Sequence, residues 1–257
     1  MPFITLTSDL GLKDHYAASI KGAILSRTPG AVLVDISHNV SNYNIVQAAY
    51  IFKHCWQNFP PGALHLISVN DLGAASRRFL LLAHKAHFFV APDNGLLPLI
   101  HDEAGLSCVE LPWPEGHPFP IQEVFASVAA RLFSGEAPES LGPNAGQIRQ
   151  RLILQPVINK SQIRGSVIYI DHYDNVIVNV SRDLFETVGK DRPFALFFKR
   201  HDPITELSSA YADRPIGEPL CLFNSAGMLE IAIHMGKAAS LLGLKIDDTI
   251  QIDFMDL

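Results

Sequence analysis

Apolar residues alternate with polar breaks along the first half of the chain, and their spacing predicts strands and helices in turn. In Tyr16–Ser26 the apolar residues fall on one face of a helix. Ala31–Ile36 is an almost unbroken apolar run, which is typical of a strand covered on both faces of a parallel sheet. Strands that alternate with helices predict an α/β domain with a mostly parallel sheet. The further strands are expected at Phe3–Thr7, Ala63–Val69, Phe79–Ala83 and Phe88–Val90, and the further helices at Ile45–Trp56 and Phe125–Phe133.

The pattern changes in the second half, where short strands follow one another between turns. The segment Ser134–Gln150 is rich in Gly, Pro, Ser and Asn, so it is the natural candidate for a linker. Leu229–Leu242 carries small apolar residues and is expected to be partly helical. We therefore predict an N-terminal α/β domain at residues 1–150 and a smaller, mainly β domain at residues 151–257. The expected strands of the second domain are Ser166–Asp171, Val176–Val180, Phe194–Phe198, Pro219–Phe223 and Thr249–Phe254.

Composition narrows the class of protein. Hydrophobic residues make up 48% of the 257 residues, which excludes global disorder. The net charge of −6 provides no basic field to collect nucleic acid. No apolar run approaches the roughly 18–20 residues that span a bilayer. Only 18% of the residues are charged, against about 25% in typical soluble domains, so part of the surface is expected to be buried against another subunit.

The N-terminus and the cysteines indicate a compartment. The first residues lack a basic region, and Asp9 interrupts the apolar stretch that a signal peptide needs, so we expect a cytoplasmic protein. The three cysteines, Cys55, Cys108 and Cys221, lie far apart without a CxxC pair. An odd number of widely spaced cysteines argues against a disulfide framework and a zinc cluster. They are expected to be reduced, semi-buried packing residues.

Polar side chains follow several predicted strands at the point where each strand ends. Asp9, Asp35 with His38, Asn70-Asp71 and Asp93-Asn94-Gly95 all occupy such places. Ligands of open α/β sheets bind beyond the carboxyl ends of the strands, so together these residues predict a shared pocket. Taken singly, each is better explained as a helix cap or turn former. A second interpretation makes Asp9, Asp35, His38 and Asp71 ligands of a divalent ion, but no HxH, HExxH or DxH motif supports it.

Common phosphate and nucleophile motifs are absent from the chain. There is no GxGxxG after the first strand, no GxxxxGK[ST] and no GxSxG. Asp9 stands where a phosphate cradle needs backbone N–H groups and no negative charge. A carboxylate at that position suits ribose hydroxyls or a cationic ligand.

Three loops of the second half also carry candidate chemistry. Ile170–Asn175 is expected to form a tight hairpin tip, in which Asp174 and Asn175 suit the turn and Asp171 and Tyr173 are not needed by it. Two tyrosines on loops, Tyr173 and Tyr211, are either exposed packing residues or a stacking slot for a base. The third loop, Asn224–Gly227, lies between a strand and an apolar stretch.

Six stretches of the chain, taken in order, resemble one known family. They are TSDLGLKDHY, VDISHNV, APDNGLL, GSVIYIDHYDNVIVNV, YADRPIGEP and FNSAGMLEIAI. Together they resemble the S-adenosyl-L-methionine hydroxide adenosyltransferases, a family related to fluorinating and chlorinating enzymes. The resemblance implies a C-terminal β-barrel-like domain and a homotrimer whose sites lie between the N-terminal domain of one subunit and the C-terminal domain of the next. It also implies that water attacks C5′ of the ribose to give adenosine and L-methionine, with no metal or other cofactor.

The resemblance also assigns roles to individual residues. It implies that Asp9 accepts hydrogen bonds from the ribose hydroxyls and that Tyr43 lies beside the sugar. The methionine ammonium and carboxylate would be held by Asp14, Asp171, Asn175 and Ser225, with Glu230 close by. The remaining substrate-binding residues are Asn94 in the strand-end cluster, Tyr173 and Tyr211 around the adenine, and Ile233 and Met235 with their backbone at its edge.

The catalytic part of the resemblance is incomplete. The family has an Asp–Arg–His set that positions the water, and Asp71 and Arg78 keep the spacing of the first two within Asp71–Arg78. The position of the family histidine is Pro120, which has no proton chemistry, and His117 lies three residues earlier. Hydrolysis of S-adenosylmethionine is the leading hypothesis. The alternatives are a protein that binds S-adenosylmethionine or adenosine without turnover, and an enzyme for another nucleophile or a related nucleoside.

Overall fold

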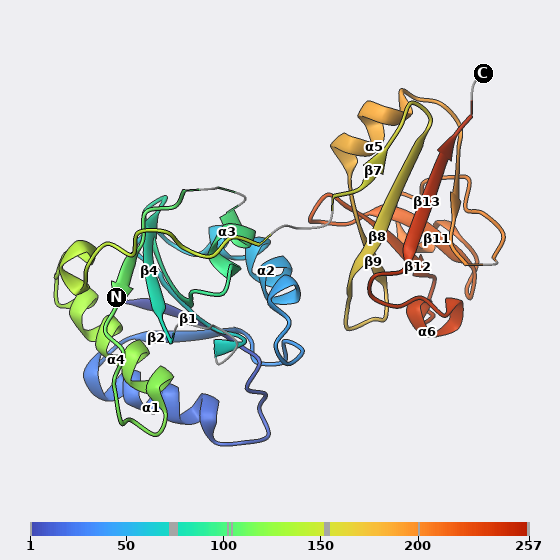
Figure 1. Cartoon of the computed structure of the whole chain (residues 1–257). Helices are drawn as coiled ribbons and strands as arrows, with labels where there is room; N and C mark the ends of the chain where they lie inside the picture. Colours follow the sequence, from blue (N-terminus) through green and yellow to red (C-terminus); the bar gives the residue numbers. More distant parts are fainter. Residues whose placement is uncertain are drawn as a thin grey trace. The chain divides into compact units, whose positions relative to one another are not determined.

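The chain divides into two compact units, which are Met1–Ile153 and Leu154–Leu257. The computed structural model describes residues 2–71, 77–101, 103, 105–151, 155–199 and 201–255. Each unit has its own hydrophobic core. Among the described residues no helix is long and apolar enough to cross a membrane. The helices and strands of both units are drawn in Figure 1.

The N-terminal unit is built on a mixed sheet with the strand order β2-β1-β3-β5-β4-β6. The first four strands of this order are parallel, and β4 and β6 run antiparallel to their neighbours. The prediction of a mostly parallel sheet thus holds for one side of the sheet only, because β4 returns to β5 through a tight turn. The strands are β1 (Phe3–Ser8), β2 (Val32–Ser37), β3 (Leu64–Ser68), β4 (Phe79–His84), β5 (His87–Pro92) and β6 (Val109–Leu111).

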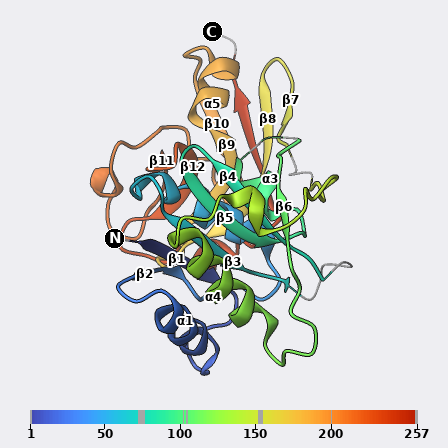
Figure 2. The ribbon, with the colours of Figure 1, turned by 90° about the vertical axis from the view of Figure 1, so that its left-hand side faces the viewer.

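Helices cover both faces of this sheet. Successive side chains of a strand point to opposite faces, so Leu64 and Leu66 pack on one side, and Ile67 packs on the other. The first face is covered by α1 (Tyr16–Arg27) and α4 (Pro120–Phe133), which lie together in Figures 1 and 2. The second face is covered by α2 (Ile45–Lys53) and α3 (Leu96–His101). With both faces buried, most side chains within the strands are apolar, whereas Asp9, Asn70, Asp71 and Asn94 follow the strand ends.

Two details of the N-terminal unit differ from the expectation. Helix α4 begins at Pro120, five residues before the predicted start, because the fixed φ of proline suits the first position of a helix. The segment Ser134–Gln150, which was expected to be a linker, packs against the N-terminal unit. It contains a 3-10 helix at Pro138–Leu141, and the backbones of Pro143 and Ala145 hydrogen-bond with Glu110 and Cys108. The Gly and Pro residues of this segment therefore lie in turns of a packed chain. Its residues 143–148, called the strap below, run along β6.

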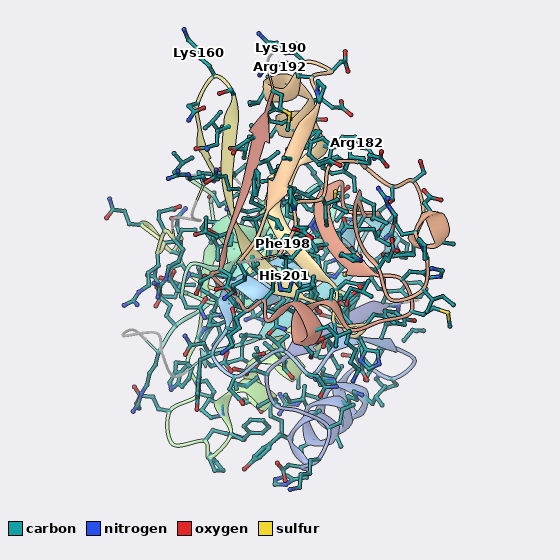
Figure 3. All side chains as sticks on the ribbon, turned by 90° about the vertical axis from the view of Figure 1, so that its right-hand side faces the viewer. Lys160, Arg182, Lys190, Arg192, Phe198 and His201 are labelled. Atoms are coloured by element: carbon teal, nitrogen blue, oxygen red, sulfur yellow. The ribbon has the colours of Figure 1, made fainter. Side chains whose placement is uncertain are left out.

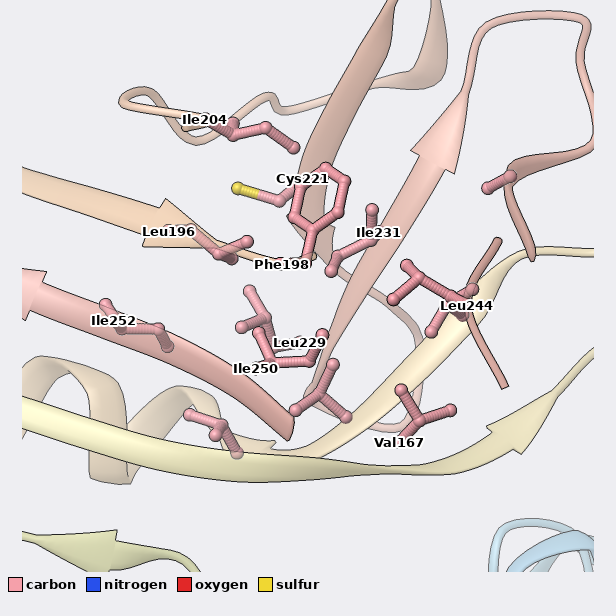
Figure 4. Packing of buried hydrophobic residues seen from close by; sticks show 14 of the residues in the cluster. Val167, Leu196, Phe198, Ile204, Cys221, Leu229, Ile231, Leu244, Ile250 and Ile252 are labelled. Carbon is pink, nitrogen blue, oxygen red and sulfur yellow. The ribbon is translucent and has the colours of Figure 1, made fainter. Parts of the chain in front are cut away.

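The C-terminal unit is an antiparallel sheet with the order β10-β13-β8-β9-β12-β11, and β7 pairs with β8. The two edge strands are both contacted by one short segment, in which Ile204 bridges Leu196 of β10 and Leu207 bridges Cys221 of β11. The sheet therefore curls around one large core, part of which is drawn in Figure 4. The strands are β7 (Val157–Ile158), β8 (Gln162–Ile170), β9 (Val176–Ser181), β10 (Phe194–Phe197), β11 (Pro219–Phe223), β12 (Met228–Ile233) and β13 (Thr249–Phe254).

Two short helices complete the C-terminal unit, α5 (Arg182–Gly189) and α6 (Ala238–Leu242). The predicted partly helical stretch Leu229–Leu242 is thus a strand followed by a helix. At one end of the unit, labelled in Figure 3, Arg192 donates to the carbonyls of Gly189 and Lys160 and ties α5 to the β7–β8 turn. All three cysteines are free, as expected, and burial raises the pKa of both Cys55 and Cys108 to about 11.

Candidate functional site

The carboxyl ends of β1, β3 and β5 bring the first group of site residues together. Asp9 follows β1, and its Oδ2 accepts hydrogen bonds from the backbone N–H groups of Tyr43 (2.8 Å) and Asn70 (3.2 Å). Asn94 follows β5, is buried, and donates through Nδ2 to the carbonyl of Val69 at 2.9 Å. Asp9, Asn70 and Asn94 therefore lie together at the strand ends, as the sequence predicts. The carboxylate of Asp9 is fixed by backbone donors before any ligand arrives.

Asp71 has the most unusual environment of this group. Its Oδ2 accepts a 2.6 Å hydrogen bond from the hydroxyl of Ser68, the last residue of β3. Its Oδ1 is buried and has no hydrogen-bond partner among the described residues. Burial raises the pKa of Asp71 to about 7, and the charge of nearby Asp9 adds to the rise, while Ser68 opposes it. A carboxyl that titrates near neutral pH and keeps one free oxygen is suited to accept a proton from water.

Arg78 is held in a different network. Its Nε and Nη2 donate to Oδ2 of Asp93 at 3.1 and 2.7 Å, and its Nη1 donates to Oε2 of Glu110 at 3.0 Å. The carbonyls of Ala145 and Gln147 accept further hydrogen bonds from the same guanidinium. No contact joins Arg78 to Asp71 among the described residues. This network anchors the strap of residues 143–148, and the predicted pairing of Asp71 with Arg78 stays a prediction. The intervening residues 72–76 of that motif lie outside the described residues.

The residues of the divalent-ion interpretation do not converge. His38 is buried and its ring lies between Ser8 Oγ (2.7 Å from Nδ1) and Asp35 Oδ1 (3.1 Å from Nε2). Asp35 also pairs with Lys21. No group of three or more metal-ligating side chains is found within the described part of the chain. Asp35 and His38 instead fix the end of β1, since the carbonyl of His38 also accepts from the N–H of Gly11.

The other predicted residues of the N-terminal unit lie at its surface. Asp14 is exposed, and Tyr43 is 70% exposed with a positive φ of 65°. His117 accepts a hydrogen bond at Nδ1 from the N–H of Phe119 (3.1 Å), and its charge acts on Glu123, which is paired with Arg27. This places His117 beside the α1–α4 contact, and nothing in the described residues joins it to Asp71.

The hairpin tip between β8 and β9 orders the second group of site residues. Asp171 accepts from both the backbone N–H (2.7 Å) and the side-chain amide (3.3 Å) of Asn175, which is buried. Asp174 adopts a positive φ of 70°, and its Oδ2 accepts a hydrogen bond from the backbone N–H of Ser240. Tyr173 is 76% exposed. The turn therefore uses Asp174, as predicted, and leaves the ring of Tyr173 open to a ligand.

A buried carboxylate lies next to this hairpin. Glu230 on β12 accepts a 2.7 Å hydrogen bond from the hydroxyl of Tyr211 and a 3.1 Å hydrogen bond from the amide of Asn224. Burial raises the pKa of Glu230, and the charge of Asp171 raises it further. Ser225 is exposed in the neighbouring loop. The two carboxyl groups are within electrostatic reach of each other and form an acidic pair that suits a cationic group.

The end of β12 supplies the remaining predicted residues. Ile233 is buried, and its carbonyl accepts from the N–H of Gly236. Met235 between them is 81% exposed with a positive φ of 54°. The chain thus turns sharply just after the strand and presents an apolar side chain to solvent.

The sequence did not single out Ser68 and Arg151, and it indicated Asn224 only as part of a loop. Ser68 carries the contact to Asp71, Asn224 orients Glu230, and Arg151 lines a cavity of about 460 Å³ with residues 42–46, Asn70 and Leu99. A serine that ends a buried strand three residues before an Asp was the available signal for Ser68. The proximity of Arg151 depends on the strap between β6 and the end of the unit, which no local pattern shows.

Comparison with known proteins assigns the two groups to the two domains of one family. A family model described as the SAM hydroxide adenosyltransferase N-terminal domain matches residues 4–142, and the model of the C-terminal domain matches residues 165–251. Both halves therefore match domains of one class of protein that acts on S-adenosyl-L-methionine (SAM). The chain belongs to the SAM hydroxide adenosyltransferase family.

Relatives of known activity and a solved structure align along nearly the whole chain. An (R)-S-adenosyl-L-methionine hydrolase of Thermus thermophilus is 29% identical over 93% of this chain and 94% of its own length. One of Methanocaldococcus jannaschii is 27% identical over 98% of this chain and 96% of its own. A fluorinase of Actinoplanes is 24% identical over 98% and 97%. The crystal structure of an uncharacterized conserved protein from Thermotoga maritima superposes with a TM-score of 0.86 at 30% identity, covering 97% of this chain and 99% of that one.

Proposed function

We propose that the protein hydrolyses SAM to adenosine and L-methionine. The observation that carries the proposal is that both family models match in order, one in each unit, and that relatives named SAM hydrolases align end to end. The reaction needs little beyond placement, because the sulfonium is already a good leaving group. Water attacks C5′ opposite the sulfur, the C5′–S bond breaks, and its electron pair remains on sulfur to give the thioether of methionine.

In this proposal, the two groups of residues bind different parts of SAM. Asp9, held by the backbone of Tyr43 and Asn70, accepts from the ribose hydroxyls. Asp14 and Asp171 bind the methionine ammonium, and the exposed rings of Tyr173 and Tyr211 flank the adenine. Asp71 holds the water. This assignment combines the family resemblance with the fixed geometry of Asp9, Asp71 and Asp171.

We also propose that three copies assemble and that residues of two copies complete each site. Large apolar side chains are exposed near both groups of site residues, among them Leu12 at 64%, Ile216 at 70% and Met235 at 81%. Light scattering coupled to gel filtration is expected to give three times the mass of the chain. A monomer that hydrolyses SAM at the full rate would contradict this assembly.

The test of the proposed function is direct. Purified protein incubated with SAM is expected to release adenosine and methionine in equal amounts, followed by chromatography, and the Asp71→Ala variant is expected to release neither. The proposed reaction uses no metal, so EDTA is expected to leave the rate unchanged. A rate abolished by EDTA and restored by a divalent ion would contradict the metal-free reaction.

A second candidate is a protein that binds SAM or adenosine without turning it over. It is favoured by Pro120 at the position of the family histidine and by the commitment of Arg78 to Asp93 and Glu110. Tight binding of SAM by calorimetry with no product after prolonged incubation would establish this candidate instead.

The Asp171→Asn variant tests how the methionine ammonium is held. The substitution removes a negative charge but keeps an oxygen that can accept from Asn175, so KM for SAM is expected to rise about tenfold or more, which is about 1.4 kcal/mol or more. Inhibition by adenosine, which lacks the ammonium, is expected to stay within about twofold. The matched control is Asp174→Asn in the same hairpin, where Asn tolerates the positive φ. An equal rise for SAM and adenosine would contradict the assignment.

A further inference from the structure

In the described part of the chain, no cation is among the groups that act on Asp71 at the end of β3. Burial disfavours ionisation of Asp71, and the negative charge of nearby Asp9 adds to the effect. Asp9 is stabilised by two backbone N–H groups, whereas Asp71 receives a single hydroxyl donor from Ser68. Of the two carboxyl groups, Asp71 is therefore the one that retains a proton.

The neighbouring cations are engaged elsewhere. Arg78 gives its donors to Asp93, Glu110 and two carbonyls of the strap. Arg151 points its Nε at the carbonyl of Asn94, 3.5 Å away. Asn94, on the β5 side of Asp71, is uncharged and donates to the carbonyls of Val69 and Asn70. None of the groups that act on Asp71 within the described residues is positive, so a cationic ligand would bring the positive charge to it.

We propose that binding of a cationic substrate displaces the proton of Asp71, so that the base forms only when the sulfonium is in place, and that Ser68 is the positioning residue that holds the resulting carboxylate. This inference rests on the proposed function. The buried Oδ1, which has no partner within the described residues, is the oxygen left to accept a proton from the attacking water, because Oδ2 is engaged by Ser68.

The proton balance of the reaction agrees with such a cycle. SAM carries one positive charge more than the sum of its neutral products, so hydrolysis by water must release one proton. The proton that Asp71 gives up on binding goes to solvent. The proton taken from the attacking water then returns to Asp71, and the positive charge disappears when the C5′–S electron pair neutralises the sulfonium. Asp71 ends protonated beside neutral products, ready for the next cationic substrate.

Calorimetry tests the inference without turnover. Sinefungin has a protonated amine on carbon in place of the sulfonium and cannot be hydrolysed, whereas S-adenosyl-L-homocysteine has a neutral thioether. Titration in phosphate and in Tris, which differ in ionisation enthalpy, gives the number of protons released. At pH 7 wild type is expected to release roughly half a proton with sinefungin, because a group with a pKa of about 7 is half protonated there, and almost none with the homocysteine compound.

Variants identify the source of the proton. Asp71→Asn is expected to bind sinefungin without this release. Ser68→Ala removes the donor that stabilises the carboxylate, so the release is expected to persist to higher pH, and Ser68→Thr is expected to restore the wild-type profile. Circular dichroism checks that each variant is folded. Equal release from wild type and Asp71→Asn, or from the two compounds, would overturn the inference and leave the proposed function standing. Failure of both compounds to bind would overturn both.

Discussion

The Asp71→Asn variant is expected to lower kcat for SAM by a factor of about 10² to 10⁴, the range that a general base contributes. The amide has the same shape and still accepts from Ser68, whose hydroxyl is 2.6 Å from Oδ2, but it cannot take a proton from water. Binding of adenosine is expected to change by less than about threefold, since the lost group faces the water. The measurement is product release at saturating SAM together with calorimetry of adenosine.

The pH dependence of the wild type follows from the same group. Burial raises the pKa of Asp71 to about 7, so kcat/KM is expected to rise with pH and to level off above that value. The raised pKa also means that the folded state binds this proton more tightly than the unfolded state does. Stability is therefore lost as pH rises from the unfolded value of 3.8 through 7. Above pH 7 the Asn variant is expected to be more stable by up to about 4 kcal/mol.

The combination of lost activity and gained stability separates a catalytic carboxyl from a structural one. A matched control is Asp35→Asn on β2, which is expected to leave kcat within about threefold because Asp35 pairs with Lys21 and His38. Its activity also tests the divalent-ion interpretation. An Asp71→Asn variant that turns over SAM at the wild-type rate, or that is destabilised at pH 8, would contradict the role of Asp71.

The second large expected effect is a loss of stability in acid. It is caused by a buried histidine that has no part in the proposed reaction. His65 on β3 is fully buried, with Nδ1 2.8 Å from Thr5 Oγ1 and Nε2 3.1 Å from His87 Nδ1. Burial lowers the pKa of His65 to about 3, and the neighbouring His87 and His101 add to the effect. The ring must therefore stay neutral in the folded unit.

The sign of the effect is fixed by this lowered pKa. The unfolded state binds a proton at His65 below about pH 6.5 and the folded state only near 3, so stability is intact above 6.5 and falls as the pH drops toward 3. Between pH 7.5 and 4.5 the free energy of unfolding is expected to fall by about 3 kcal/mol from this residue alone. Urea titrations followed by tryptophan fluorescence report on this unit, because Trp56 and Trp113 both belong to it and Trp56 packs on His87.

Substitution of His65 isolates its share of the acid sensitivity. His65→Phe leaves Thr5 and His87 without a partner and is expected to cost about 1–3 kcal/mol at pH 7.5. The fall between pH 7.5 and 4.5 is nevertheless expected to be about 3 kcal/mol smaller than in wild type. The control His172→Gln changes an exposed histidine of the other unit and is expected to leave the fall unchanged. An unaltered fall in His65→Phe would show that other groups cause it.

Local patterns determined much of this protein. Unbroken apolar runs flanked by turn residues identified the central strands, and α1 was predicted to within one residue, because burial imposes a period on the sequence. Asp9, Asn70 and Asn94 were predicted to meet because parallel strands end at one edge of a sheet, and hydrogen bonds join them. The antiparallel β4 and the strap of residues 143–148 were not predicted, since strand direction and docking depend on contacts remote in sequence.

The same division holds for the chemistry. The sequence by itself placed Asp71 at a strand end and, through six ordered motifs, indicated the family to which the chain belongs. Only the tertiary structure showed that Ser68 contacts Asp71 and that Arg78 is committed to Asp93 and Glu110. It also showed that Oδ1 of Asp71 is buried and has no partner in the described part of the chain. Residue type and spacing give the kind of group at a position. Burial and neighbouring charges, which decide whether that group holds a proton, arise only when distant segments pack together.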